Sequence, residues 1–170
     1  MSAAENNAVE RDVAVDEKTS QFLTFSLADE EYGVDILRVQ EVKGWTPVTR
    51  IPQAPEYVRG VLNLRGTIVP IIDLRMRFNI DTVEYTRTTV IIVVSVESEE
   101  GDRVIGIVVD GVSDVVDVVH EKIKSAPDFG TKVHTEFISG LATFDDKMVM
   151  LLDIDKLLTS AEIAGLDALR

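Results

Sequence analysis

The chain has 170 residues, a formal net charge of −13 at pH 7 and no cysteine. This length suffices for one domain of ordinary size or two very small ones, and it allows a core to be buried without crosslinks. Without cysteine the chain can form no disulfide, no zinc–thiolate site and no cysteine nucleophile, which fits a reducing compartment. The acidic balance disfavours nucleic acid and anionic membranes as direct partners, and solubility is its first explanation.

The N-terminal segment carries no fold signal. Residues 1–20 contain no aromatic residue and no periodic apolar positions, so we expect a disordered acidic tail. The segment has neither the basic start nor the apolar run of a signal peptide, and no later apolar stretch reaches the roughly 18 residues of a membrane span. We therefore expect a soluble, cytoplasmic protein without direct membrane insertion.

The first elements predicted after the tail are two strands and a helix. The apolar run at residues 22–27 has strand composition, and a return strand is expected at 32–34 after a polar turn. Asp35 is expected to cap a short helix that continues to Lys43, because Gly44 follows as a stop signal.

An extended segment and a hairpin are expected next. Pro47 and Pro52 are incompatible with a helix, so the stretch around them is predicted to be extended. Residues 61–74 read VLNLRGTIVPIIDL, two apolar runs separated by Arg65 and Gly66. This pattern predicts a hairpin that turns at the Arg-Gly pair.

The second half of the chain repeats the first, which indicates an internal duplication. A β-branched strand is predicted at 90–96 and its return strand at 103–109. The spacing between matching positions is nearly constant as far as Phe129 and takes a second, longer value from Ile138 onward, so a single insertion of eight residues within 130–137 explains the change. The matched pairs include Gly33 with Gly106, Pro55 with Pro127, Gly60 with Gly140, and Asp73 with Asp153.

Each repeat of about 70 residues has four or five short strands and little helix, which is typical of a small closed barrel. We therefore predict a mainly β fold of two similar barrels packed together, with a binding groove between them. The repeat units are placed at about 21–86 and 87–158, and an exchange of strands at their boundary is left open. A C-terminal helix is predicted at 159–170, because Thr159 and Glu162 form a capping box.

No motif for catalysis, metal binding or cofactor binding is found in the sequence. His120 and His134 are the only histidines, and neither belongs to a zinc or nucleophile motif. Asp73 and Asp153 are kept at equivalent strand ends in both repeats, so a turn or cap explains them better than chemistry does. We expect a non-enzymatic binding protein without a metal or cofactor.

Positions at which the repeats differ in charge are candidates for function, because the shared fold does not require them. Asn63-Leu64-Arg65-Gly66 stands opposite Thr143-Phe144-Asp145-Asp146. Arg38 stands opposite Gly111. Arg65 is either a solvated turn residue or an interface residue, since arginine is enriched at the centres of interfaces.

The sequence resembles the CheW family of coupling proteins in bacterial chemotaxis. The resemblance covers residues 20–158 and is carried by DEEYGVDI at 29–36, VQEV at 39–42, RGVLNLRG at 59–66 and GIVVDGVSDV at 106–115. It implies two five-stranded, SH3-like barrels. It also implies a scaffold that links the tips of methyl-accepting chemoreceptors to the regulatory domain of the histidine kinase CheA, in receptor arrays below the inner membrane.

The resemblance further implies two contact sites. It assigns to the receptor-facing groove Val39, Glu41 and Arg65. It assigns to the contact with the kinase domain, or with other copies of the coupler in rings, Lys124, Asp128 and Phe129. A core position for Phe129 is an equally weighted alternative, because its repeat partner Tyr57 is expected to be half-buried.

Other functions stay open beside this one. The same fold occurs in the C-terminal domain of CheA and in the N-terminal half of CheV, but a chain of this length leaves no room for a kinase core, so a stand-alone coupler is expected. A coupler of a non-flagellar pathway, such as pilus-based motility, would have the same sequence features. A small-molecule-binding β-barrel protein is the less favoured alternative, and its mark would be a closed apolar pocket with convergent polar groups.

Overall fold

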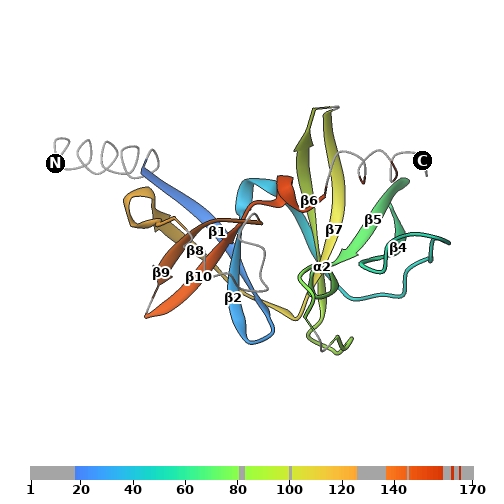
Figure 1. Cartoon of the computed structure of the whole chain (residues 1–170), viewed down its shortest axis with the longest axis horizontal. Coiled ribbons are helices and arrows are strands. Elements are labelled where there is room, and N and C mark those ends of the chain that lie inside the picture. The colour runs from blue at the N-terminus through green and yellow to red at the C-terminus, as the bar shows by residue number, and fades with distance from the viewer. Residues whose placement is uncertain are drawn as a thin grey trace, which may run out of the picture.

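The computed structural model describes residues 18–80, 83–99, 101–125, 137–144 and 146–158, together with Glu162 and Gly165. Within these ranges ten strands form two five-stranded sheets, and the two curled sheets lie side by side (Figure 1). The predicted mainly β fold of two small barrels is confirmed.

The two sheets are called barrel A and barrel B. Barrel A contains β1 (Thr19–Leu27), β2 (Glu30–Asp35), β8 (Gly111–Val119), β9 (Ile138–Phe144) and β10 (Lys147–Leu152). Barrel B contains β3 (Val39–Gly44), β4 (Val58–Leu64), β5 (Thr67–Asp73), β6 (Val90–Ser98) and β7 (Gly101–Val109). The short helical elements are η1 (Ile36–Arg38), α2 (Leu74–Arg77), η2 (His120–Lys122) and η4 (Ile154–Lys156).

The strands of the two repeats are exchanged between the barrels. Barrel A takes β1 and β2 from the first half of the chain and the last three strands from the second, and barrel B takes the reciprocal set. The strand orders β8-β1-β2-β10-β9 and β3-β6-β7-β5-β4 become identical when each strand is replaced by its repeat counterpart. The duplication in the sequence therefore gives two barrels of the same topology.

Strands β1 and β6 are buried on both faces because each lies between two apolar cores. In β6, Ile92 and Val94 belong to the large core that both barrels share, whereas Ile91 and Val93 belong to the interior of barrel B. In strand β1, Leu23, Phe25 and Leu27 belong to the shared core and Phe22 belongs to the interior of barrel A. Successive side chains of a strand point to opposite faces, which explains the almost unbroken apolar sequence of β6.

Each barrel is closed by the segment that follows its edge strand. Thr49, after β3, exchanges backbone hydrogen bonds of 3.1 and 2.9 Å with Val61 of β4. Lys124, after β8, makes the equivalent pair with Leu141 of β9, at 2.8 and 2.7 Å. These pairs occupy backbone groups that an open sheet edge would expose.

The helix predicted from Asp35 to Lys43 is wrong. The structure has a single 3₁₀ turn, η1, after which the chain continues as β3. Asp35 does cap this turn, since its side chain accepts a hydrogen bond from the backbone N–H of Leu37. The pairing of β3 with β6 satisfies the backbone as a strand, and this tertiary pairing overrides the local preference.

The predicted hairpin and the predicted caps are confirmed. Strands β4 and β5 are antiparallel and turn at Arg65 and Gly66, whose φ angles of 52° and 88° suit a tight two-residue turn. Asp73 caps α2 by accepting a hydrogen bond from the N–H of Arg75. Asp153 caps η4 in the same way.

The two predicted terminal segments are described only in part. The predicted tail is described from Lys18, and β1 already begins at Thr19. Of the predicted C-terminal helix, Glu162 and Gly165 are described, and both have helical backbone. In the part of the chain that the structure describes, no helix is long and apolar enough to cross a membrane.

Candidate partner-binding site

Glu41 and Arg65 meet on barrel B although they come from opposite edges of its sheet. Glu41 lies in β3, at one edge, and Arg65 lies in the turn after β4, at the other edge. The Nη1 atom of Arg65 is 2.9 Å from Oε2 of Glu41. The curl of the sheet brings these two edges together, so the ion pair spans the closure of the barrel.

This ion pair positions Arg65 more than it stabilises the fold. The side chain of Arg65 is 83% exposed and that of Glu41 is 27% exposed. An exposed pair of this kind contributes about 0–1 kcal/mol to stability. A guanidinium carries five N–H donors in a fixed plane. The guanidinium of Arg65 can therefore contact Glu41 and still donate to a carboxylate or carbonyl of a partner.

Val39 lies two residues before Glu41 in the same strand. It is half-buried and packs against the core that the two barrels share. The structure adds Leu37 to the residues of this candidate site. The sequence analysis did not select Leu37, because a helix was expected there. Leu37 lies on η1 and is 87% exposed, so it offers an apolar surface two residues from Val39.

The second predicted contact site is described only at Lys124. Lys124 is exposed and belongs to barrel A through its pairing with Leu141. Asp128 and Phe129 lie outside the described residues, so the choice between core and interface for Phe129 stays a prediction. Since Glu41 and Arg65 lie on barrel B, the structure separates Lys124 from them by placing it on the other barrel.

The ion pair has no counterpart of the same charge in barrel A. Asp114 is the repeat counterpart of Glu41, and Asp145 is the repeat counterpart of Arg65, so both equivalent positions are acidic. The duplication therefore does not preserve the charge of this turn. This difference marks the surface around Arg65 as specific to barrel B.

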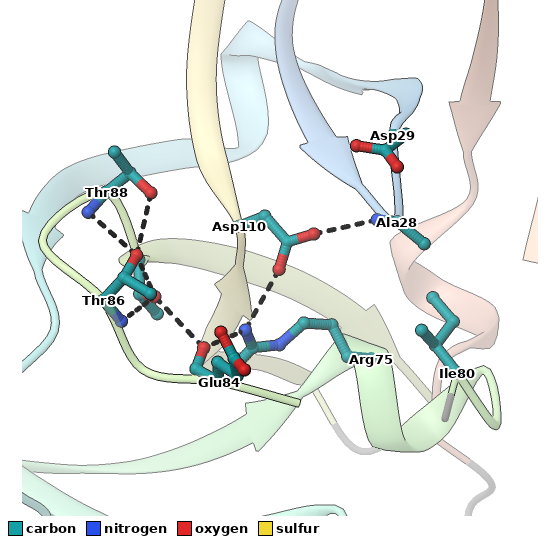
Figure 2. Close-up of a pocket in the computed structure, with 9 residues that line it drawn as sticks. Ala28, Asp29, Arg75, Ile80, Glu84, Thr86, Thr88 and Asp110 are labelled. Carbon is teal, nitrogen blue, oxygen red and sulfur yellow. Dashed lines mark hydrogen bonds and ion pairs between the residues drawn. The ribbon is translucent and has the colours of Figure 1, made fainter. Parts of the chain in front are cut away.

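A polar cavity of about 460 Å³ lies at the junction of the barrels (Figure 2). It is lined by Ala28, Asp29, Arg75, Ile80, Glu84, Thr86, Thr88, Thr89 and Asp110. The cation of this lining, Arg75, is already paired with Asp110, at 3.0 Å, and with Asp73, at 2.9 Å. Because these carboxylates neutralise Arg75, we interpret the cavity as part of the barrel junction rather than as a substrate site.

The described residues do not contain a cluster of metal ligands. No group of three or more histidine, aspartate or glutamate side chains among them is placed to hold a metal ion. A mostly apolar cavity of about 330 Å³ lies beside Pro55 and Leu158. This cavity and the polar one are both open on one side, so neither has the closed form expected of the small-molecule alternative.

These features define a class, a small, mainly β protein of two fused barrels. A family model described as "CheW-like domain" matches residues 21–162. The chain is 50% identical over 147 residues to the chemotaxis protein CheW of Klebsiella aerogenes, with 86% of each chain covered. It is 38% identical over 142 residues to the chemotaxis protein CheW of Rhizobium meliloti, covering 84% of this chain and 89% of the relative.

A solved structure agrees with these matches. The scaffolding protein TtCheW from Thermoanaerobacter tengcongensis superposes with a TM-score of 0.75 and 35% sequence identity, over 84% of this chain and 90% of that one. The chain therefore belongs to the CheW-like family, whose general role is that of a chemotaxis scaffold.

Proposed function

We propose that this protein is a non-enzymatic, cytoplasmic adaptor that couples the tips of chemoreceptors to the regulatory domain of the kinase CheA. The observation that supports the proposal most is the exposed Arg65, held by Glu41 across the closure of a barrel in a CheW-like fold. The pair adds little to stability, so its placement is better explained by a partner. In an array the protein would also contact further copies of itself.

The receptor contact is proposed at Val39, Glu41 and Arg65. A receptor tip is a helical hairpin, and a helix that docks in a groove needs apolar anchors together with a few charges that set its register. Val39 and the exposed Leu37 would supply the apolar contact, and Arg65 would supply the charge.

The kinase or ring contact is proposed at Lys124, Asp128 and Phe129. Lys124 lies on barrel A, so this contact and the receptor contact would use different barrels. One molecule could then hold both partners at once. The avidity of an array would allow each single contact to be modest.

The variant Arg65→Glu tests the proposal. We expect it to keep the circular dichroism spectrum of the parent and its binding to the CheA regulatory domain in a titration. We expect it to lose receptor-dependent control of CheA autophosphorylation in a reconstituted assay, because the charge that contacts the receptor is reversed.

Two matched variants complete this experiment. Arg87→Glu makes the same charge change at another exposed arginine of barrel B, and it should keep kinase control. Lys124→Glu should instead weaken the titration with the kinase domain. Normal kinase control by Arg65→Glu would reject the assigned receptor contact, and loss of its folded spectrum would make Arg65 a structural residue.

A further inference from the structure

Two polar clusters cross the junction between the barrels, and the family relationship does not assign them a role. The Arg75 clamp consists of Arg75, Asp110 and the backbone N–H of Ala28. The Arg38 clamp consists of Arg38, Asp155 and the backbone groups of Ser95 and Glu97. In each clamp, one residue lies on the connection from one barrel to the other, namely Asp110 or Arg38. Its partner, Arg75 or Asp155, follows the last strand of a repeat.

In the Arg75 clamp, the carboxylate of Asp110 connects the two barrels (Figure 2). Asp110 lies between β7 of barrel B and β8 of barrel A. Its Oδ1 accepts a hydrogen bond of 3.0 Å from Arg75 of barrel B, and its Oδ2 accepts one of 2.8 Å from the N–H of Ala28, in the β1–β2 turn of barrel A. Arg75 itself is almost completely buried.

In the Arg38 clamp, the residue on the connection between the barrels is an arginine, where the Arg75 clamp has an aspartate. Arg38 lies on η1, between β2 of barrel A and β3 of barrel B. It donates two hydrogen bonds, of 2.9 and 2.8 Å, to the carboxylate of Asp155, which follows β10 of barrel A. It also donates one of 3.0 Å to the carbonyl of Ser95, and Asp155 accepts one of 2.8 Å from the N–H of Glu97, both in β6 of barrel B.

The two clamps occupy corresponding places in the two repeats, with their charges reversed, although Arg38 and Asp110 are one position apart in the repeat alignment, where Arg38 stands opposite Gly111. Arg75 lies two residues after the cap Asp73, and Asp155 lies two residues after the equivalent cap Asp153. Each residue pairs with an opposite charge on the connection between the barrels. Both repeats therefore carry an ion pair between the connection and the residue two positions after the cap, and the cation lies on the connection in one pair and after the cap in the other.

Ala28 and Glu97 complete this equivalence. Gly33 and Gly106 are repeat counterparts, and their cross-strand partners are Thr24 in β1 and Val93 in β6. Ala28 and Glu97 each lie four residues after these partners, and each donates its N–H to the carboxylate of a clamp.

We propose that Arg38 and Asp155 are positioning residues that fix the orientation of barrel A relative to barrel B. The shared core holds the barrels together, but apolar contact has no directional preference. A bidentate pair between a guanidinium and a carboxylate has a fixed planar geometry and therefore restricts rotation. If the proposed function holds, this restriction transmits a change at the receptor contact on barrel B to the partner contact on barrel A.

The orientation can be measured because the chain has no cysteine of its own. Thr67→Cys and Lys147→Cys introduce one spin label on each barrel, at exposed positions at the starts of β5 and β10. Pulsed electron paramagnetic resonance then gives the distribution of distances between the labels. We expect a single narrow distance distribution for the parent. We expect a broadened or shifted distance distribution for Arg38→Met and for Asp155→Asn.

Controls make the result specific to the clamp. Arg87→Met and Asp117→Asn remove one charge of each sign at exposed positions outside both clamps, and they should keep the narrow distribution. The double variant Arg38→Met with Asp155→Asn should change the distribution by less than the two single changes combined, because the two residues are direct partners. If Arg38→Met fails to fold, Asp155→Asn carries the test, since its side-chain carbonyl can still accept the N–H of Glu97.

Distributions of the folded single variants that coincide with the parent would overturn the proposal. The distance measurement needs no partner, so it stands whether or not the proposed function is correct. In the reconstituted assay, the proposal expects a clamp variant to bind receptor and kinase domain separately but to lose receptor control of the kinase. Failure of the parent itself in that assay would reject the proposed function and leave the clamp result unaffected.

Discussion

Single residues show how this acidic protein tolerates charge in its core. Asp73 is fully buried, and its two oxygens accept hydrogen bonds from the backbone and side chain of Arg75 and from the hydroxyl of Tyr85. A buried carboxylate is tolerated when its acceptor sites are filled and a cation lies beside it. The cap at Asp73 was predictable because Asp153 occupies the equivalent position of the other repeat. The sequence did not predict that Arg75 and Tyr85 would be the side-chain partners of Asp73.

The first prediction concerns Arg75→Met, which removes the counter-ion and leaves Asp73 buried. Breaking a buried pair in this way typically costs about 3–5 kcal/mol. We expect a loss of that size in the free energy of unfolding measured with urea. The exposed control Arg87→Met should change this free energy by less than about 0.5 kcal/mol. An equally small loss for Arg75→Met would mean that the core accommodates Asp73 without its cation.

The second prediction concerns Tyr85 at alkaline pH. Burial and the hydrogen bond to Asp73 raise the pKa of Tyr85 to about 12. An unfolded tyrosine has a pKa of about 10, so the folded state holds the phenolic proton more tightly. The resulting stabilisation is fully present below about pH 10 and is lost as the pH rises towards about 12.

Urea unfolding between about pH 9 and pH 11.5 measures this effect. The free energy of unfolding should fall more steeply with pH in the parent than in Tyr85→Phe. Tyr32 is present in both proteins, and burial raises its pKa too, so the difference between the two curves reports Tyr85. Parallel curves would contradict the assignment.

Secondary-structure elements depend on contacts that the local sequence does not contain. The stretch at 35–43 has the cap and stop signals of a helix, but all except its first turn pairs with β6. The hairpin at 61–74 was predictable because its turn residues and its apolar runs agree with each other. The closure of barrel B at Thr49 was not predictable from the sequence. It depends on the close approach of the segment at Thr49 to β4 at Gly60.

The third prediction concerns Gly60→Ala. Gly60 has a φ of 149°, and a Cβ atom there would overlap the carbonyl oxygen of Thr49. We expect a loss of about 2–4 kcal/mol in the free energy of unfolding, from backbone strain and overpacking together. Gly44→Ala is the matched control, since a Cβ at Gly44 would meet no atom within 4 Å. Equal stability of the two variants would show that the segment at Thr49 can move away from β4.

The largest core of the molecule belongs to both barrels. This core contains Leu23 and Phe25 of barrel A together with Ile92, Val94 and Ile107 of barrel B. The exchange of strands also means that neither barrel is formed by a continuous half of the chain. Separate folding of one barrel would expose its share of this core to water.

The fourth prediction is a single cooperative unfolding transition. Trp45 is the only tryptophan and stacks on Tyr85 in barrel B, with ring centroids 4.2 Å apart. Its fluorescence therefore reports barrel B, whereas far-ultraviolet circular dichroism reports both barrels. We expect the two signals to give the same midpoint and slope in urea, as a two-state transition requires. An earlier or later fluorescence transition would show that the barrels unfold separately.

The sequence by itself determined the β class, the duplication, the two capping aspartates and the turn that carries Arg65. These features follow from local composition and from the comparison of one repeat with the other. Only the tertiary structure decided that the strands are exchanged, that Glu41 faces Arg65, and that Arg38 pairs with Asp155. Equivalent repeats offer equivalent strand edges, so pairing within a repeat and pairing between repeats bury the same apolar faces and leave the same sequence pattern. The ion pairs depend on which pairing is formed, because side chains distant in sequence meet only once the barrels close.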